Sequence, residues 1–259
     1  MSSKPIGIFD SGVGGTSIFK EIHSLLPKES TIYLADSNNA PYGQKPKQTI
    51  IDLCVKNTEL LLEKDCKLIV VACNTATTNA ISFLRSQYDI PFIGIEPAIK
   101  PAALKSKTKS IGILATKGTL SSELFSNTSE LYAKGISVIE QDGEGIVPLV
   151  ESGKIDSPEM RQLLASYLKP MLDANIDYLV LGCTHYPYLI PVLKNMLPEH
   201  ITIIDSGEAV ARQTKAILMA NTLENNSTNT TKHTFYTNSN KTVLESLISN
   251  QFEVQELKF

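Results

Sequence analysis

The chain has 259 residues, 42% of them hydrophobic, which is enough for one large α/β domain or for two smaller lobes around a sizeable core. Its formal net charge of −3 removes the electrostatic reason to expect a nucleic acid or a membrane surface as a partner. No apolar run approaches the roughly 20 residues that span a bilayer, and the short polar N-terminus has no signal-peptide pattern. We therefore expect a cytoplasmic protein whose four cysteines are reduced.

Short apolar runs alternate with amphipathic stretches along the chain, a pattern typical of parallel sheets covered by helices. Clear helical patterns cover residues 49–63 and 157–174. The apolar runs predict eight buried strands, which are Ile6–Phe9, Thr31–Ala35, Leu68–Ala72, Phe92–Ile95, Ile111–Ala115, Ser137–Glu140, Tyr178–Gly182 and Ile201–Ile204.

Parts of this pattern repeat. Ile6–Phe9 is similar to Ile111–Leu114, and Val70–Cys73 is similar to Val180–Cys183. Chance similarity between apolar strands is the alternative explanation, but two matches in the same order count against it. We therefore predict an α/β fold of two similar lobes, each a mostly parallel sheet flanked by helices.

The C-terminal part of the chain is predicted to return to the first lobe. Residues 221–232 are polar, rich in Asn and Thr and without periodicity, as in a surface loop. Residues 234–236, 242–247 and 254–257 then predict a strand, a helix and an edge strand. The expected first lobe comprises residues 1–96 and 210–259, and the expected second lobe comprises residues 97–209.

Two cysteines occupy equivalent places in the repeat. Cys73 and Cys183 each follow a buried strand, where open α/β sheets bind ligands and where a helix N-terminus favours a thiolate. The alternative is a small buried hydrophobic residue, an interpretation that fits Cys54 and Cys66 better. Cys73 and Cys183 differ from those two in having polar neighbours suited to bind a carboxylate, which are Asn74, Thr75, Thr184 and His185.

Other uses of thiols fit the sequence less well. There is no C-x₂-C spacing and the chain has only four histidines, so we predict no metal site. A dithiol redox pair is an alternative, but the sequence lacks the C-x₂-C arrangement typical of such pairs. A cysteine hydrolase needs one nucleophile and one histidine, and that chemistry leaves the second, equivalent cysteine unexplained.

A glycine-rich turn, Asp10–Thr16, lies between a predicted strand and a helix, where the backbone can approach a ligand closely. It is not a P-loop, and Ser17 takes the place of the third glycine in the dinucleotide-binding fingerprint. A nucleotide site is therefore poorly supported, although Asp36 resembles the ribose-binding acid of such sites in its position. For Asp10 itself, a simple helix N-cap is the alternative.

Three other candidates have simple structural alternatives. Tyr42 and Gly43 lie in the loop after a predicted strand, where a bare turn would be unremarkable. Glu151 ends an apolar stretch, and a glutamate there more often faces solvent. His185 has the alternative of a hydrogen-bonded core histidine, but its position beside Cys183 favours a catalytic role.

The ordered set of motifs resembles that of bacterial glutamate racemases over nearly the whole length of the chain. The cysteine motifs alone would fit the wider aspartate/glutamate racemase superfamily, whereas the segments at 8–15 and 36–43 favour its glutamate branch. The matching segments are IFDSGVGG (8–15), the stretch from Asp36 to PYG (36–43), ACNTAT (72–77), IGIEPAIKPA (93–102), VPLVESG (147–153), LGCTHYP (181–187) and IIDSGEAVA (203–211).

This resemblance implies an active site in the cleft between two facing lobes, with Cys73 and Cys183 as proton donor and acceptor. It implies that Asp10 assists Cys73, that Glu151 and His185 assist Cys183, and that the product D-glutamate supplies peptidoglycan synthesis. The residues implied to contact glutamate are Asp10, Ser11, Tyr42, Gly43, Asn74, Thr75, Thr184 and His185.

Racemisation removes the α-proton from one face of an amino acid and returns a proton to the other face. Two bases on opposite sides do this without turning the substrate over, and two similar lobes can supply two similar bases. A free thiol has a pKa of about 8.5, so each cysteine needs a nearby group that can accept or hold its proton. No pattern suggests a pyridoxal phosphate site, so we expect no cofactor.

Two rival functions remain open at this point. Aspartate or another acidic amino acid is an alternative substrate, because spacing does not reveal substrate length. An amino-acid-binding or sensing protein without turnover is an alternative of a different class, although binding alone does not need two thiols. Our expectation that the chain forms a homodimer rests on no motif in the sequence.

Overall fold

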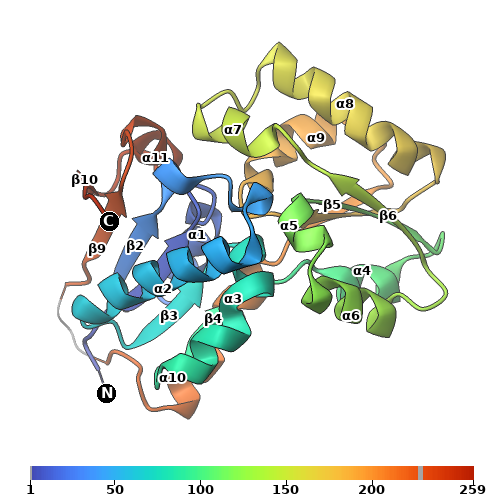
Figure 1. Ribbon diagram of the computed structural model, residues 1–259. Coiled ribbons are helices and arrows are strands. Elements are labelled where there is room, and N and C mark those ends of the chain that lie inside the picture. Colours follow the sequence, from blue (N-terminus) through green and yellow to red (C-terminus); the bar gives the residue numbers. More distant parts are fainter. Residues whose placement is uncertain (1, 227–229) are drawn as a thin grey trace.

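The computed structural model describes residues 2–226 and 230–259, and it shows two α/β lobes side by side, with both chain ends in the same lobe (Figure 1). All eight strands predicted from the apolar runs are present, within two residues of the expected bounds. The described part of the expected loop at 221–232 contains neither helix nor strand, and residues 227–229 lie outside the described residues.

The first lobe is built on a parallel sheet in the order β10-β9-β2-β1-β3-β4. Its central strands are buried along their whole length because helices cover both faces. Ile6 and Ile8 pack toward the helices α1 and α10, while Phe9 and Val71 pack toward α2 and α3. The strands are β1 (Ile6–Asp10), β2 (Thr31–Ala35), β3 (Leu68–Val71), β4 (Phe92–Gly94), β9 (His233–Thr237) and β10 (Val254–Glu256), and the helices are α1 (Thr16–Leu25), α2 (Lys47–Glu63), α3 (Asn74–Gln87), α10 (Gly207–Ala220) and α11 (Thr242–Leu247).

The second lobe has a parallel sheet in the order β6-β5-β7-β8. The helices α4 and α6 contribute to the apolar core on one face of this sheet, and α8 and α9 contribute to the core on the other. The strands are β5 (Ser110–Ala115), β6 (Ser137–Asp142), β7 (Tyr178–Gly182) and β8 (Thr202–Ile204), and the helices are α4 (Ile99–Lys105), α5 (Lys117–Leu120), α6 (Glu123–Tyr132), α7 (Ile146–Glu151), α8 (Pro158–Asp173) and α9 (Ile190–Met196).

The strand order confirms the predicted repeat. The order β2-β1-β3-β4 in one sheet corresponds to β6-β5-β7-β8 in the other, so β1 matches β5 and β3 matches β7. Cys73 and Cys183 therefore follow topologically equivalent strands. The expected return of the C-terminal segment is also present, because β9 and β10 extend the first sheet and β10 forms its edge.

The chain passes between the lobes twice, after β4 and after β8. The Ser206 hydroxyl donates a hydrogen bond to the main-chain oxygen of Glu96 and so ties the two passages together. We propose the lobe boundaries expected from the sequence, residues 1–96 with 210–259 and residues 97–209, because these passages lie close to them.

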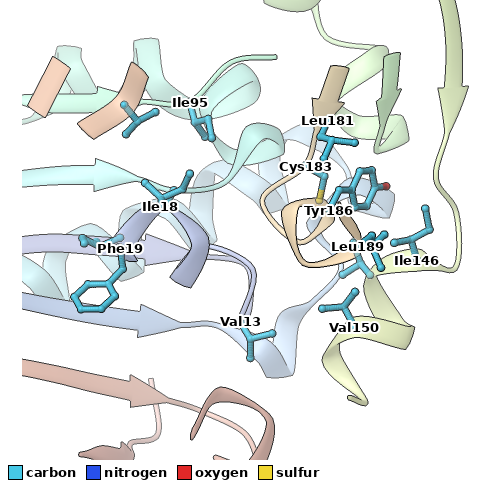
Figure 2. Close-up of a cluster of buried hydrophobic side chains, with 14 of the residues drawn as sticks. Val13, Ile18, Phe19, Ile95, Ile146, Val150, Leu181, Cys183, Tyr186 and Leu189 are labelled. Atoms are coloured by element: carbon cyan, nitrogen blue, oxygen red, sulfur yellow. The ribbon is translucent and has the colours of Figure 1, made fainter. Parts of the chain in front are cut away.

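One apolar cluster is continuous across the two lobes. Figure 2 shows Val13, from the turn after β1, close to Val150 of α7, and it shows Cys183 beside Tyr186. The lobes therefore share a hydrophobic contact next to the second cysteine. Within the described residues, no helix combines the length and the apolar character that crossing a bilayer requires.

Candidate active site

Both repeated cysteines line a single cavity between the lobes. The cavity is narrow, with about 10 Å³ open to the centre of a water-sized sphere, which is room for about one water molecule. It lies at the carboxyl ends of the central strands, where parallel α/β sheets bind ligands. The lining residues are Ser11, Pro41, Tyr42, Gly43, Cys73, Asn74, Thr75, Thr116, Val147, Cys183, Thr184 and His185.

Cys73 is the N-cap residue of α3. Its sulfur accepts a hydrogen bond from the main-chain N–H of Ala76 at 3.4 Å and lies 3.6 Å from the hydroxyl oxygen of Ser11. Burial and the nearby charge of Asp10 hold the pKa of the Cys73 thiol well above its usual range, although the contacts with Ala76 and Ser11 act to lower it. The protonated thiol is therefore the favoured form of Cys73 in this closed arrangement.

Cys183 begins a chain of polar contacts that runs away from the cavity. Its sulfur lies 3.8 Å from Nδ1 of His185, and Nε2 of the same ring lies 2.5 Å from Oε1 of Glu151. Burial lowers the pKa of His185, but the hydrogen bonds and charges of Cys183 and Glu151 outweigh burial and raise it well above its ordinary value. The protonated form of the His185 ring is therefore favoured, and this ring lies beside the sulfur of Cys183.

Glu151 is mostly buried, in contrast to the solvent-exposed alternative that its sequence position suggested; its side chain is 15% exposed. The carboxylate accepts a hydrogen bond from the main-chain N–H of Val13 at 2.7 Å and another from the hydroxyl of Ser37 at 2.8 Å. Both donors belong to the first lobe, so this second-lobe carboxylate is held from across the cleft.

Asp10, at the end of β1, is completely buried. One of its carboxylate oxygens accepts hydrogen bonds from the main-chain N–H groups of Gly12 (3.2 Å) and Gly15 (2.9 Å), and the other accepts one from Thr184 Oγ1 (3.2 Å). Burial raises the pKa of Asp10, while His185 and the Gly15 N–H act to lower it. Asp10 lies near enough to Cys73 to influence its charge, but the atom in contact with the Cys73 sulfur is the Ser11 hydroxyl.

The glycine-rich turn is a contact between the lobes, and this explains its composition. A Cβ atom on Gly12 would lie 1.9 Å from Oε1 of Glu151, and one on Gly14 would lie 2.3 Å from Nδ1 of His185. Glycines are therefore needed at these positions because side chains of the second lobe approach the backbone of the first. The groups that approach this turn most closely are thus the side chains of two catalytic candidates, Glu151 and His185, so its glycines have an explanation other than phosphate binding.

Asn74 is the clearest ligand-binding candidate in the cavity. Both polar atoms of its side chain are buried and have no hydrogen-bond partner among the described residues. An unpaired buried polar group costs about 1–3 kcal/mol, so such a group in a cavity usually indicates a ligand or water that satisfies it. An amide offers a bound amino acid both a donor and an acceptor.

Asp10 is the expected contact residue that does not line the cavity; the others that do are Ser11, Tyr42, Gly43, Thr75, Thr184 and His185. The hydroxyl groups of Thr75 and Tyr42 already have partners. Thr75 Oγ1 lies 2.7 Å from Thr116 Oγ1 across the lobes. The hydroxyl of Tyr42 donates to the buried carboxylate of Asp36, so Asp36 supports the loop of Tyr42 and Gly43 rather than a ribose.

Sequence reasoning missed four residues of the site: Pro41, Thr116 and Val147 line the cavity, and Ser37 contacts Glu151. A signal for Thr116 was available: Ile111 matches Ile6 in the repeat, so Thr116 matches Ser11. The other three lie in the matching segments 36–43 and 147–153, but nothing local marks them as site residues, because their proximity to the site depends on how the two lobes face each other.

Comparisons with known proteins identify the family. Residues 6–214 match the family model of Asp/Glu/hydantoin racemases. A glutamate racemase from Pseudomonas syringae pv. tomato is 46% identical over 215 residues, which make up 83% of this chain and 78% of that protein.

Solved structures agree with this match. A crystal structure of a glutamate racemase from Bacillus anthracis superposes with a TM-score of 0.89 at 32% identity, covering 100% of this chain and 99% of that one. An Escherichia coli glutamate racemase, solved with L-glutamate and the activator UDP-MurNAc-Ala, gives a TM-score of 0.87 at 32% identity, with 98% and 97% covered. The resemblance and the two-lobed α/β fold predicted from the sequence are thereby confirmed, and the chain belongs to the Asp/Glu/hydantoin racemase family of isomerases.

Proposed function

We propose that this protein is a cofactor-independent glutamate racemase in which Cys73 and Cys183 transfer protons on opposite faces of the α-carbon. The observation that carries the proposal is that these two cysteines, which follow the equivalent strands β3 and β7, line one cavity. Neither a hydrolase nor a binding protein gives a reason for two thiols in such equivalent places.

The reaction needs one thiolate and one thiol at the start. In one direction the Cys183 thiolate, next to the His185 imidazolium, takes the α-proton, and the carbanion then takes a proton from the Cys73 thiol. In the other direction the two thiols exchange roles. Between turnovers, solvent and the neighbouring groups return the protons, a task suited to the Glu151–His185 pair on one side and to Asp10 on the other.

The carbanion forms in a narrow, water-poor cavity where fixed dipoles are most effective. The unpaired amide of Asn74 is the main group available to bind and polarise a substrate carboxylate. Substrate entry requires the lobes to separate, because the cavity has room for about one water molecule only. An adjoining cleft of about 660 Å³, also lined by Pro41, Gly43, Thr116 and Val147, is the proposed approach to it.

Glutamate is the proposed substrate because relatives that are 46% identical to this chain carry that activity in their names. D-glutamate would serve peptidoglycan synthesis in the cytoplasm, where free thiols such as the four of this chain stay reduced. We further propose a homodimer, which light scattering coupled to size-exclusion chromatography would test directly.

Chiral chromatography tests the proposed activity. The dialysed and chelator-treated enzyme is incubated with L-glutamate, D-glutamate or L-aspartate, and the enantiomers are separated over time. We expect both glutamate enantiomers to approach an equal mixture and L-aspartate to change far more slowly. Faster conversion of aspartate would overturn the substrate assignment. Binding of glutamate without conversion would support the amino-acid-binding alternative.

A further inference from the structure

Ser37 is a first-lobe residue that contacts the second-lobe acid–base pair. It begins the short helix η1 (Ser37–Asn39) directly after β2 and Asp36. Its hydroxyl donates to Oε2 of Glu151 at 2.8 Å, while Oε1 of Glu151 contacts His185 Nε2 at 2.5 Å. The serine therefore binds the carboxylate oxygen that His185 leaves free.

The position of Ser37 is itself firmly fixed. The preceding residue, Asp36, is completely buried, and its Oδ1 accepts hydrogen bonds from Asn39 at 2.7 Å and from Asn238 at 2.5 Å. Its other carboxylate oxygen accepts from Tyr42. Because these groups all belong to the first lobe, Ser37 moves with that lobe and not with Glu151.

Glu151 therefore has partners on both sides of the cleft. Val13 and Ser37 bind it from the first lobe, whereas His185 binds it within the second lobe. The first-lobe carboxylate has a similar arrangement, since Asp10 accepts a hydrogen bond from Thr184 of the second lobe. Separation of the lobes breaks these contacts across the cleft, and closure restores them.

We propose that Ser37 is a positioning residue: by donating to Glu151 across the cleft, it orients the Glu151–His185 pair against Cys183 and completes that base only when the lobes close. The inference rests on the proposed racemase function. The Ser37–Glu151 contact couples closure of the lobes around the substrate to the orientation of the Glu151–His185 pair that acts on Cys183. Proton abstraction by Cys183 is thereby delayed until solvent has been excluded.

Substitutions at Ser37 that keep or remove the hydroxyl test this role. Ser37→Thr retains a hydroxyl donor, whereas Ser37→Val introduces a side chain of nearly the same shape as threonine that has no hydroxyl group. Ser17→Ala is the matched control, because the Ser17 hydroxyl also bridges the lobes, to the main-chain oxygen of Thr184 at 3.0 Å, but contacts neither carboxylate. Thermal unfolding of each variant establishes that it is folded.

The decisive readout is the isotope effect measured separately from each α-deuterated enantiomer. Because the two enantiomers have equal free energy, kcat/KM falls equally in both directions for any variant, so rates alone do not identify the affected thiol. We expect Ser37→Val to lower kcat/KM about tenfold, the typical effect of one hydrogen bond to a charged group. The isotope effect of Ser37→Val should rise only for the enantiomer whose α-proton Cys183 removes. A Cys183→Ser variant identifies which enantiomer that is.

The pH profile gives a second, independent readout. The contact with Glu151 helps to raise the pKa of His185, so a poorly oriented Glu151 lets that pKa fall. The alkaline limb of the kcat/KM profile should move to lower pH in Ser37→Val and stay in place in Ser37→Thr and Ser17→Ala.

Three outcomes would count against the proposal. Unchanged kinetics in Ser37→Val, isotope effects that rise equally for both enantiomers, or the same pattern in Ser17→Ala would each remove the specific role of Ser37. In all three cases the wild-type enzyme still racemises glutamate. An inactive wild-type enzyme would instead overturn the proposed function itself.

Discussion

The two cysteines are equivalent in topology but differ in their electrostatic surroundings. Cys73 is buried near the carboxylate of Asp10, and both effects raise the pKa of its thiol. Cys183 has the His185 ring 3.8 Å away, and the contacts of that ring with Cys183 and Glu151 favour its protonated form. The proposed mechanism needs one protonated and one ionised thiol, and the two sulfurs have different charged neighbours from which such a difference can arise.

Replacement of either repeated cysteine tests whether both thiols are needed. We expect Cys73→Ala and Cys183→Ala each to lower racemisation by at least about 10³-fold, because one face of the α-carbon then has no proton-transfer group. Each change removes only a sulfur atom, so the variants should stay folded, at a cost of about 1 kcal/mol. The measurement is chiral chromatography, with circular dichroism to confirm the fold.

Cys54→Ala is the matched control for these two substitutions. Cys54 is also completely buried, but it belongs to an apolar cluster of the first lobe and does not line the cavity. Its loss should leave kcat close to the wild-type value. Near-normal turnover in either active-site variant would refute the two-thiol mechanism.

At the scale of elements, local sequence patterns predicted which strands form, but not which segments far apart in the sequence contact one another. The strands were predictable because alternation and apolar runs are local properties of the chain. The glycine-rich turn was predictable as a close-approach site, but its partners, Glu151 and His185, lie more than a hundred residues away in sequence. Similarly, no local feature of Ser37 indicates that it contacts Glu151.

The close contacts of the glycine-rich turn after β1 predict that an added side chain in this turn lowers activity. In a Gly14→Ala variant, the new methyl group would lie 2.3 Å from Nδ1 of His185, a ring that is only 1% exposed. Either His185 shifts away from Cys183 or the lobes fail to close. We expect kcat/KM to fall by about 100-fold, as small displacements of catalytic groups commonly cause.

Gly135→Ala is a control that separates activity from stability. Gly135 has a φ of 79° in the loop before β6, and a Cβ there meets no atom within 4 Å. Alanine should cost about 1 kcal/mol in unfolding free energy because of its backbone conformation, with kcat/KM unchanged. If Gly14→Ala lost only stability and kept its activity, the role of the turn in positioning His185 would be wrong.

The whole molecule explains why an internal repeat suits this reaction. The first lobe supplies the thiol that follows β3, and the second lobe supplies the thiol that follows the equivalent strand β7. Because the lobes face each other, both thiols line one cavity. The repeat and the two lobes were predictable from paired motifs in the sequence. Their mutual placement was not, because it depends on contacts across the cleft such as Thr184 with Asp10 and Val13 with Glu151.

Solvent labelling tests the two-lobe mechanism as a whole. With one thiol on each face, L-glutamate in D₂O gives up its α-proton to one cysteine and receives deuterium from the other, which has already exchanged with solvent. The first D-glutamate formed should therefore carry deuterium at the α-carbon, while recovered L-glutamate stays almost unlabelled. Mass spectrometry of the separated enantiomers within the first few per cent of conversion measures both labels, and the same run from D-glutamate is the control for symmetry.

A single base that served both faces would carry the original proton across, so substantial unlabelled D-glutamate at this stage would contradict separate roles for Cys73 and Cys183. Exchange of the abstracting thiol with solvent labels only the returned L-glutamate, so the label in the product is the decisive measurement.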